Sequence, residues 1–255
     1  MTLKIEVFKC FEGNFGFLIH DEKTGKTISI DAGDENVIFK ILKKNNWVLS
    51  DIFITHHEWD HTDGLPALKK ATGAKIYAPL LERDKIITYD KLVKGGDIIP
   101  FGEFEFTVIN TFGHTLGHVA YFEKNSKSLF CGDALFSLGC GRMREGTPEM
   151  MWEGLKRLNE LPDETLVYCG HEYSKDNAKF ARFIDPNNEK LKIRQKEIDE
   201  QLAKGEFTIP TSLGDEKIMN PFLRCEDEMI AKKMGLENKD AIAVFASLRK
   251  AKDVF

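Results

Sequence analysis

A stretch of six residues that directly follows an apolar run carries four side chains able to bind a metal ion: His56, Glu58, Asp60 and His61. Imidazoles and carboxylates are the ligands that zinc, iron and manganese accept in hydrolytic sites. Side chains two apart in an extended chain point the same way, so we expect His56 and Glu58 to reach one ion. Asp60 and His61 are expected to reach a second ion, while His57 points elsewhere.

Three further potential ligands follow later apolar runs that are predicted to be strands: His114, Asp133 and His171. A dinuclear hydrolytic site needs such side chains on loops at strand ends, because paired ions lower the pKa of a shared water towards neutrality. Asp133 has two oxygens and can bridge both ions. We expect His114 to complete the first ion's ligands and His171 the second's. Any single histidine here can instead be a hydrogen-bonded loop residue, but the joint pattern favours a dinuclear site.

The composition is that of an ordinary globular protein. The chain has 255 residues, 42% of them hydrophobic and 30% charged, with a net charge of -5, which argues against general affinity for nucleic acid. No apolar run approaches the roughly 18 residues that span a membrane. The first residues lack a signal-peptide pattern, and the five cysteines are odd in number and scattered, so we expect reduced thiols in a cytoplasmic protein.

The order of predicted elements suggests an α/β domain followed by a helical appendage. Strands are predicted at residues 4–9, 15–20, 27–31, 51–55, 75–78, 104–111, 118–122, 129–131 and 165–169. Helices are predicted at residues 35–44, 65–72, 147–161, 175–183, 188–204, 227–234 and 240–250. This order fits an α/β sandwich as well as a doubly wound sheet. The character of the sequence changes near residues 172–175, where we place a domain boundary.

The pattern H-x-[HE]-x-D-H at residues 56–61, followed by separate His, Asp and His, resembles the metallo-β-lactamase superfamily. The resemblance narrows with GCGR at residues 139–142, GHEY at 170–173, NPFLR at 220–224 and LRKAKDVF at 248–255. Together these motifs are similar to glyoxalase II, the hydroxyacylglutathione hydrolases. The resemblance implies an α/β fold, an αββα sandwich with a C-terminal helical domain. Residues 1–173 would form the catalytic domain and 174–255 the substrate-binding domain.

The resemblance also implies an activity, hydrolysis of S-D-lactoylglutathione and related S-2-hydroxyacylglutathiones to glutathione and D-lactate. A metal-bound hydroxide attacks the thioester, and Asp60 binds metal and helps to orient this nucleophile. Carried over by position, two divalent ions are held by His56, Glu58, Asp60, His61, His114, Asp133 and His171. The only partner implied is this small-molecule thioester, and the resemblance permits a monomer.

Glutathione contacts fall on Arg142, Tyr173, Arg249 and Lys252 by the same carry-over. Arg249 and Lys252 lie about one helical turn apart, so together they can clamp the glycine carboxylate of glutathione. The alternative interpretation of this pair is a solvated terminal helix.

The chain departs from the family pattern at two positions that bear on the chemistry. Glu58 stands where histidine is usual, and its charge should weaken the Lewis acidity of the first ion and shift preference from zinc towards iron or manganese. The alternative is a damaged first site. Arg144 stands where an aromatic residue is usual and either contacts substrate or faces solvent. These departures leave two rival functions: an iron-dependent oxidative enzyme acting on a glutathione persulfide, and a catalytically weakened glutathione-thioester-binding protein.

Overall fold

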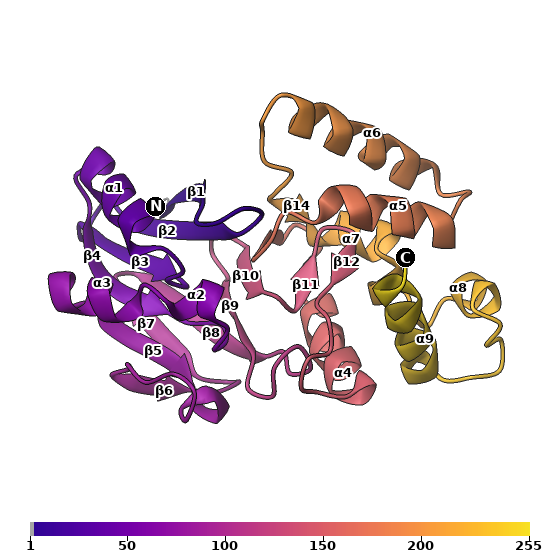
Figure 1. Ribbon diagram of the computed structural model, residues 1–255, viewed down its shortest axis with the longest axis horizontal. Coiled ribbons are helices and arrows are strands. Elements are labelled where there is room, and N and C mark those ends of the chain that lie inside the picture. The colour runs from indigo at the N-terminus through magenta and orange to yellow at the C-terminus, as the bar shows by residue number, and fades with distance from the viewer. Residues whose placement is uncertain (1–2) are drawn as a thin grey trace. The chain divides into compact units, whose positions relative to one another are not determined.

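The computed structural model describes residues 3–255, which divide into two compact units. Of the described residues, unit 1 comprises 3–110 and 115–132, and unit 2 comprises 111–114 and 133–255. Figure 1 draws both as a ribbon, with elements labelled where there is room.

The first sheet of unit 1 has six strands in the order of the sequence: β1 (Leu3–Lys9), β2 (Phe15–Asp21), β3 (Lys26–Ile30), β4 (Val48–Phe53), β5 (Lys75–Pro79) and β6 (Lys91–Val93). The first three are antiparallel, and β3 to β6 are parallel. The carboxyl ends of parallel strands meet at one edge of a sheet, which is where α/β folds place their ligands. The loop that follows β4 therefore begins at that edge.

The second group of strands in unit 1 is antiparallel: β7 (Ile98–Phe101), β8 (Phe104–Asn110), β9 (Val119–Glu123) and β10 (Ser128–Gly132). It packs face to face on the first sheet through aromatic rings. The ring of Phe53 in β4 lies 5.4 Å from that of Phe106 and 5.1 Å from that of Tyr121, centre to centre. These rings form the inner layer of a sandwich.

Two helices cover the other face of the first sheet in unit 1, α1 (Glu35–Asn45) and α3 (Leu65–Thr72). Ile38, Ile41 and Leu42 recur with helical spacing on one side of α1 and pack with Ile52 of β4 in one buried cluster. Asp34 caps this helix by accepting hydrogen bonds from two backbone amides. The connections to the strands are short, which fixes where each strand ends.

Unit 2 is mainly helical. Its strands are β11 (Leu135–Phe136), β12 (Gly139–Cys140), β13 (Leu166–Cys169) and β14 (Thr211–Ser212). Its α-helices are α4 (Pro148–Asn159), α5 (Ser174–Ile184), α6 (Glu189–Ala203), α7 (Leu213–Met219), α8 (Glu228–Lys233) and α9 (Ala241–Asp253), with a 3-10 turn η2 at Pro221–Leu223. Phe222 holds the tail together, because its ring contacts those of Phe180 in α5 and Phe245 in α9.

One local expectation was wrong. The metal-ligand loop is extended only as far as Glu58, after which α2 (Trp59–Thr62) forms one helical turn. The amide of His61 donates to the carbonyl of Glu58, and that of Asp63 to the carbonyl of Trp59. Asp60 and His61 therefore take their directions from a helical turn and not from an extended chain.

Candidate metal centre

The four ligand candidates in unit 1 lie together after β4. The Nε2 atom of His56 is 3.7 Å from a carboxylate oxygen of Glu58, and Nε2 of His61 is 3.7 Å from one of Asp60. The rings of His56 and His61 are 4.2 Å apart, and both side chains are almost fully buried. Ligand atoms bound about 2 Å from a shared ion lie roughly 3 to 3.5 Å apart. The spacing within each pair is close to this value.

A buried carboxylate that sequence reasoning missed orients two of these histidines. Asp31 accepts hydrogen bonds from the amide and hydroxyl of Thr55, at 2.7 and 2.9 Å, and from Nδ1 of His61 at 2.7 Å. The hydroxyl of Thr55 donates its hydrogen to Asp31, so in its contact of 2.9 Å with Nδ1 of His56 it is the acceptor. In their neutral form both imidazoles then carry the proton on Nδ1 and present the Nε2 lone pair, with which imidazole binds metal.

Glycine allows this loop to pack closely within unit 1. A Cβ atom at Gly33 would lie 2.2 Å from the carbonyl oxygen of Asp60. Gly132 has a φ of +47°, and a Cβ atom there would lie 2.6 Å from the hydroxyl of Thr55 and 2.9 Å from Nε2 of His118. The ring of His118 lies 4.8 Å from that of His56. Thr55 and His118 therefore leave no room for a side chain at position 132.

Unit 2 holds the other three ligand candidates, His114, Asp133 and His171, all at least nine-tenths buried. One carboxylate oxygen of Asp133 lies 3.6 Å from Nε2 of His114 and 3.2 Å from Nε2 of His171. Nδ1 of His114 donates to the carbonyl of Arg142 at 2.8 Å, so the neutral imidazole presents its Nε2 lone pair here as well. The ring of Tyr173 stacks on His171 at 4.9 Å and an angle of 8°.

The donor set fits divalent transition metals. It comprises four imidazoles and three carboxylates: His56, His61, His114 and His171 with Glu58, Asp60 and Asp133. Three of the imidazoles have Nδ1 engaged by an acceptor, the outer hydrogen bond that metal-binding histidines usually make. Mixed nitrogen and oxygen donors suit zinc, iron and manganese, and the set alone does not choose among them.

A cavity of about 560 Å³ in unit 2 collects the residues predicted to bind substrate. Its lining includes all five of them, Arg142, Arg144, Tyr173, Arg249 and Lys252, and two of the ligand candidates, His114 and Asp133. Sequence reasoning missed Asp176, Lys179 and Phe255, which also line it. Asp176 and Lys179 are exposed polar residues of α5, and no sequence pattern distinguishes them from other surface residues of a helix.

Two of the three cations of α9, Arg249 and Lys252, are held by protein groups, so the interpretation as a merely solvated helix was wrong for this pair. Arg249 is 4% exposed and donates to the carbonyl of Cys140 at 2.9 Å and to Asp253 at 2.9 and 3.1 Å. The ammonium of Lys252 donates to the carbonyl of Asp176 at 3.0 Å, and burial lowers the pKa of this lysine. Arg249 thus fixes the strand that leads to Arg142.

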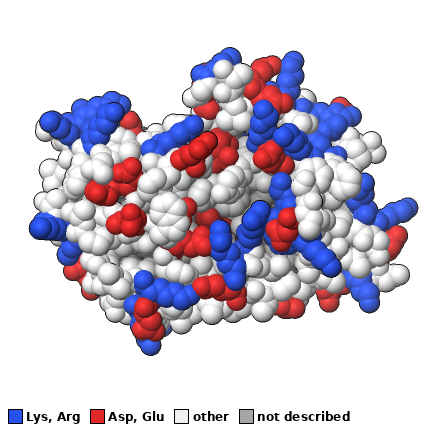
Figure 2. All heavy atoms as spheres, in the orientation of Figure 1, with Lys and Arg blue, Asp and Glu red and all other residues white. Residues whose placement is uncertain are grey.

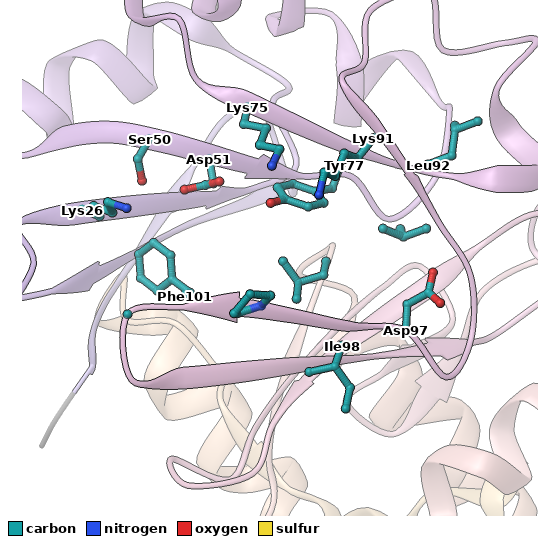
Figure 3. Close-up of a pocket in the computed structure, with 14 residues that line it drawn as sticks. Lys26, Ser50, Asp51, Lys75, Tyr77, Lys91, Leu92, Asp97, Ile98 and Phe101 are labelled. Carbon is teal, nitrogen blue, oxygen red and sulfur yellow. The ribbon is translucent and has the colours of Figure 1, made fainter.

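A second cavity, of about 630 Å³, lies wholly in unit 1. Figure 3 shows Lys75, Lys91 and Tyr77 projecting into it from β5 and β6, opposite β7. It lies towards the amino ends of the parallel strands, whereas the ligand loop follows the carboxyl end of β4. None of the predicted ligand or substrate residues lines this cavity.

Two family descriptions match consecutive parts of the chain. The metallo-beta-lactamase superfamily matches residues 13–171, and the description "Hydroxyacylglutathione hydrolase C-terminus" matches residues 172–255. Among the described residues, no helix has both the length and the apolar character needed to cross a membrane.

Individual proteins agree with these matches. A protein of Bartonella tribocorum named hydroxyacylglutathione hydrolase is 47% identical over 98% of this chain and 99% of its own length. One of the same name from a Chelativorans species is 45% identical over all of both chains. The crystal structure of ETHE1 from Myxococcus xanthus superposes with a TM-score of 0.67 at 26% identity, covering 100% of this chain and 99% of that one.

Proposed function

Because the chain belongs to the hydroxyacylglutathione hydrolase family of the metallo-β-lactamase superfamily, we propose that it hydrolyses S-D-lactoylglutathione and related S-2-hydroxyacylglutathiones to glutathione and D-lactate. The observation that carries this function is identity of 44–47% to relatives of that name along almost the whole chain. The relatives' name favours thioester hydrolysis over the oxidative alternative on a glutathione persulfide.

We propose that the seven ligand candidates, His56, Glu58, Asp60, His61, His114, Asp133 and His171, would hold two divalent ions. Such ions, when bound, supply an ionised water at neutral pH and polarise a carbonyl oxygen. The protein's part is to set the direction of each ligand. Asp31 holds His61 and, through Thr55, His56 with Nε2 available, and the carbonyl of Arg142 does the same for His114. Asp60 would bind one of these ions and help to orient the attacking water.

The cavity in unit 2 is the proposed site for the glutathione part of the substrate. Glutathione carries two carboxylates, and the cavity presents Arg142, Arg144 and Lys252 beside the ring of Tyr173. Guanidinium groups bind carboxylates with paired hydrogen bonds. When water adds to the thioester carbon and the carbon–sulfur bond breaks, the sulfur leaves as a thiolate. A thiolate is a good leaving group, so no strong general acid is needed.

We further propose a cytoplasmic monomer whose only partner is this small substrate, with a catalytic domain at 1–173 and a substrate-binding domain at 174–255. The net charge of -5 and the mixture of acidic and basic side chains on the face in Figure 2 support the absence of a nucleic-acid surface.

The test is turnover of S-D-lactoylglutathione by the purified protein, measured beside its metal content. We expect hydrolysis in proportion to bound metal. Activity that persists with zinc, which is redox-inactive, would exclude the oxidative alternative. Binding of a thioester analogue without turnover under zinc, iron or manganese would favour the binding-protein alternative instead.

A further inference from the structure

Glu82 is a carboxylate buried in unit 1 that the proposed mechanism does not use. It ends the 3-10 turn η1 (Leu80–Glu82) after β5 and is 1% exposed. One carboxylate oxygen accepts from the hydroxyl of Thr115 at 2.7 Å and from the amide of Gly117 at 2.6 Å. The other contacts Nδ1 of His57. Burying a carboxylate is costly unless its oxygens are paired, and here both are.

These contacts join three segments of unit 1 that lie far apart in sequence. His57 stands between the ligand candidates His56 and Glu58, and Thr115 directly follows His114. Position 117 must be glycine for the chain to come this close, because a Cβ atom there would lie 2.7 Å from a carboxylate oxygen of Glu82. Two of these segments, those of His57 and Thr115, are joined again where the amide of Val119 donates to the carbonyl of Thr55 at 3.0 Å.

We propose that Glu82 is a positioning residue for the metal centre, acting through His57 and through the segment from Thr115 to Gly117. A carboxylate can only accept, so Nδ1 of His57 donates to it, and this bond holds the imidazole against Glu82. With His57 fixed, the backbone on either side aims His56 and Glu58 at their ion. With Thr115 fixed, the backbone at His114 has less freedom.

This inference rests on the proposed metal centre and predicts an effect on metal affinity as well as on fold stability. The chain offers a matched control in Glu123, at the end of β9. It is also fully buried in unit 1 and accepts two backbone hydrogen bonds, from Asn125 at 3.0 Å and Ser126 at 2.6 Å. It joins only a local turn, so its loss should affect folding alone.

The experiment compares Glu82→Gln, His57→Gln and their combination with Glu123→Gln. Zinc dissociation constants are measured by competition with a chromophoric chelator, and thermal midpoints are measured in excess chelator. We expect Glu82→Gln and His57→Gln each to weaken zinc binding about tenfold, the lower end of the loss caused by removing a hydrogen bond to a ligand itself, because these two residues act through the neighbouring backbone. The combination should weaken it little more than either change alone, because the two residues act as one unit. Glu123→Gln should keep the wild-type affinity.

Several results would overturn the proposal: wild-type affinity in Glu82→Gln, equal weakening in Glu123→Gln, or additive effects of Glu82→Gln and His57→Gln. If Glu82→Gln does not fold, His57→Gln alone tests the proposal. His57 is partly exposed, and its substitution removes the same contact with Glu82. A wild-type protein that binds no zinc, iron or manganese would overturn the metal centre itself, and this inference with it.

Discussion

Glu58 is the residue with the clearest chemical consequence. Its carboxylate lies 3.7 Å from Nε2 of His56 and so belongs to the same ligand pair. A carboxylate brings a negative charge to the first ion, which a neutral imidazole would not.

We expect Glu58→His to raise the share of zinc over iron and manganese in the purified protein. The same change should move the acidic limb of the pH profile of kcat/KM to lower pH, because the less negative ligand set lowers the pKa of the reacting water. Elemental analysis and steady-state kinetics across pH measure both effects. An unchanged metal content together with an unshifted profile would show that Glu58 does not bind metal.

The ligand candidates could be predicted from sequence because each follows an apolar run that ends at a loop. Asp31 and Glu82 could not. Asp31 reaches Thr55 only because β3 and β4 pair, as when its amide donates to the carbonyl of Phe53 at 2.9 Å. Glu82 stands in a polar turn and acquires its role from a segment more than thirty residues away. Residues that orient ligands are defined by tertiary contacts, which single-sequence patterns do not carry.

At the scale of elements, α9 is fixed to β12 by a single buried guanidinium. We expect Arg249→Leu to lower the free energy of unfolding by about 2 kcal/mol, because the carbonyl of Cys140 loses a charged donor and Asp253 keeps only the longer contact with Arg142, at 3.8 Å. Urea unfolding measures this. Lys250→Leu, an exposed change in the same helix, is the control and should alter stability by less than about 0.5 kcal/mol. Equal effects of the two changes would refute the role of Arg249.

The helix α7 carries a buried acid, Glu216, whose ionisation should change the stability of the protein with pH. Glu216 accepts from the amide of Leu138 at 2.8 Å and from the amide group of Asn220 at 3.0 Å. Burial raises its pKa from 4.5 to about 7, against these hydrogen bonds, which lower it. Between those pH values the folded state holds a proton that the unfolded state has lost. The contribution of protonated Glu216 to stability is therefore fully present below pH 4.5 and is lost as pH rises to about 7.

Glu216→Gln should remove this loss, since the amide cannot ionise. We expect the two proteins to have similar free energies of unfolding at pH 5. By pH 8 the free energy of unfolding of the variant should have risen relative to that of the wild type by up to about 3 kcal/mol. Chemical unfolding of both proteins across this range gives the difference, in which the other titrating groups cancel. A constant difference at all pH values would contradict the raised pKa.

Long helices and strands could be predicted from the sequence, and the shortest could not. The helix α3 has the predicted bounds, residues 65–72. The helix α1 ends one residue later than predicted, and α6 is one residue shorter than predicted at each end. The strands β11, β12 and β14 have two residues each, too few for an alternating pattern to show. The helix α7 was missed because its polar residues Asp215, Glu216 and Lys217 read as a loop.

At the scale of the molecule, element order alone left a sandwich and a doubly wound sheet equally open. The structure of unit 1 decides between them, because the antiparallel strands β7 to β10 form a second sheet stacked on the first through Phe53 and Phe106. The predicted boundary at residue 173 stays a prediction. The two family matches meet at residues 171 and 172, whereas the compact units divide the chain at other positions.

The proposed ligands come from positions spread between residues 56 and 171 of the sequence, so removing the ions should affect much of the chain. We expect dialysis against a strong chelator to abolish hydrolysis and to lower the thermal midpoint by roughly ten degrees. Binding at a thousandfold excess over the dissociation constant is worth about 4 kcal/mol, and each kcal/mol shifts the midpoint of a chain this size by about 2–4 °C. Calorimetry and turnover, before and after chelation, measure the two losses. Zinc, manganese or anaerobic iron should restore both, and magnesium should not, because it prefers oxygen ligands. Full activity and an unchanged midpoint in metal-free protein would mean that these imidazoles and carboxylates serve some purpose other than holding ions.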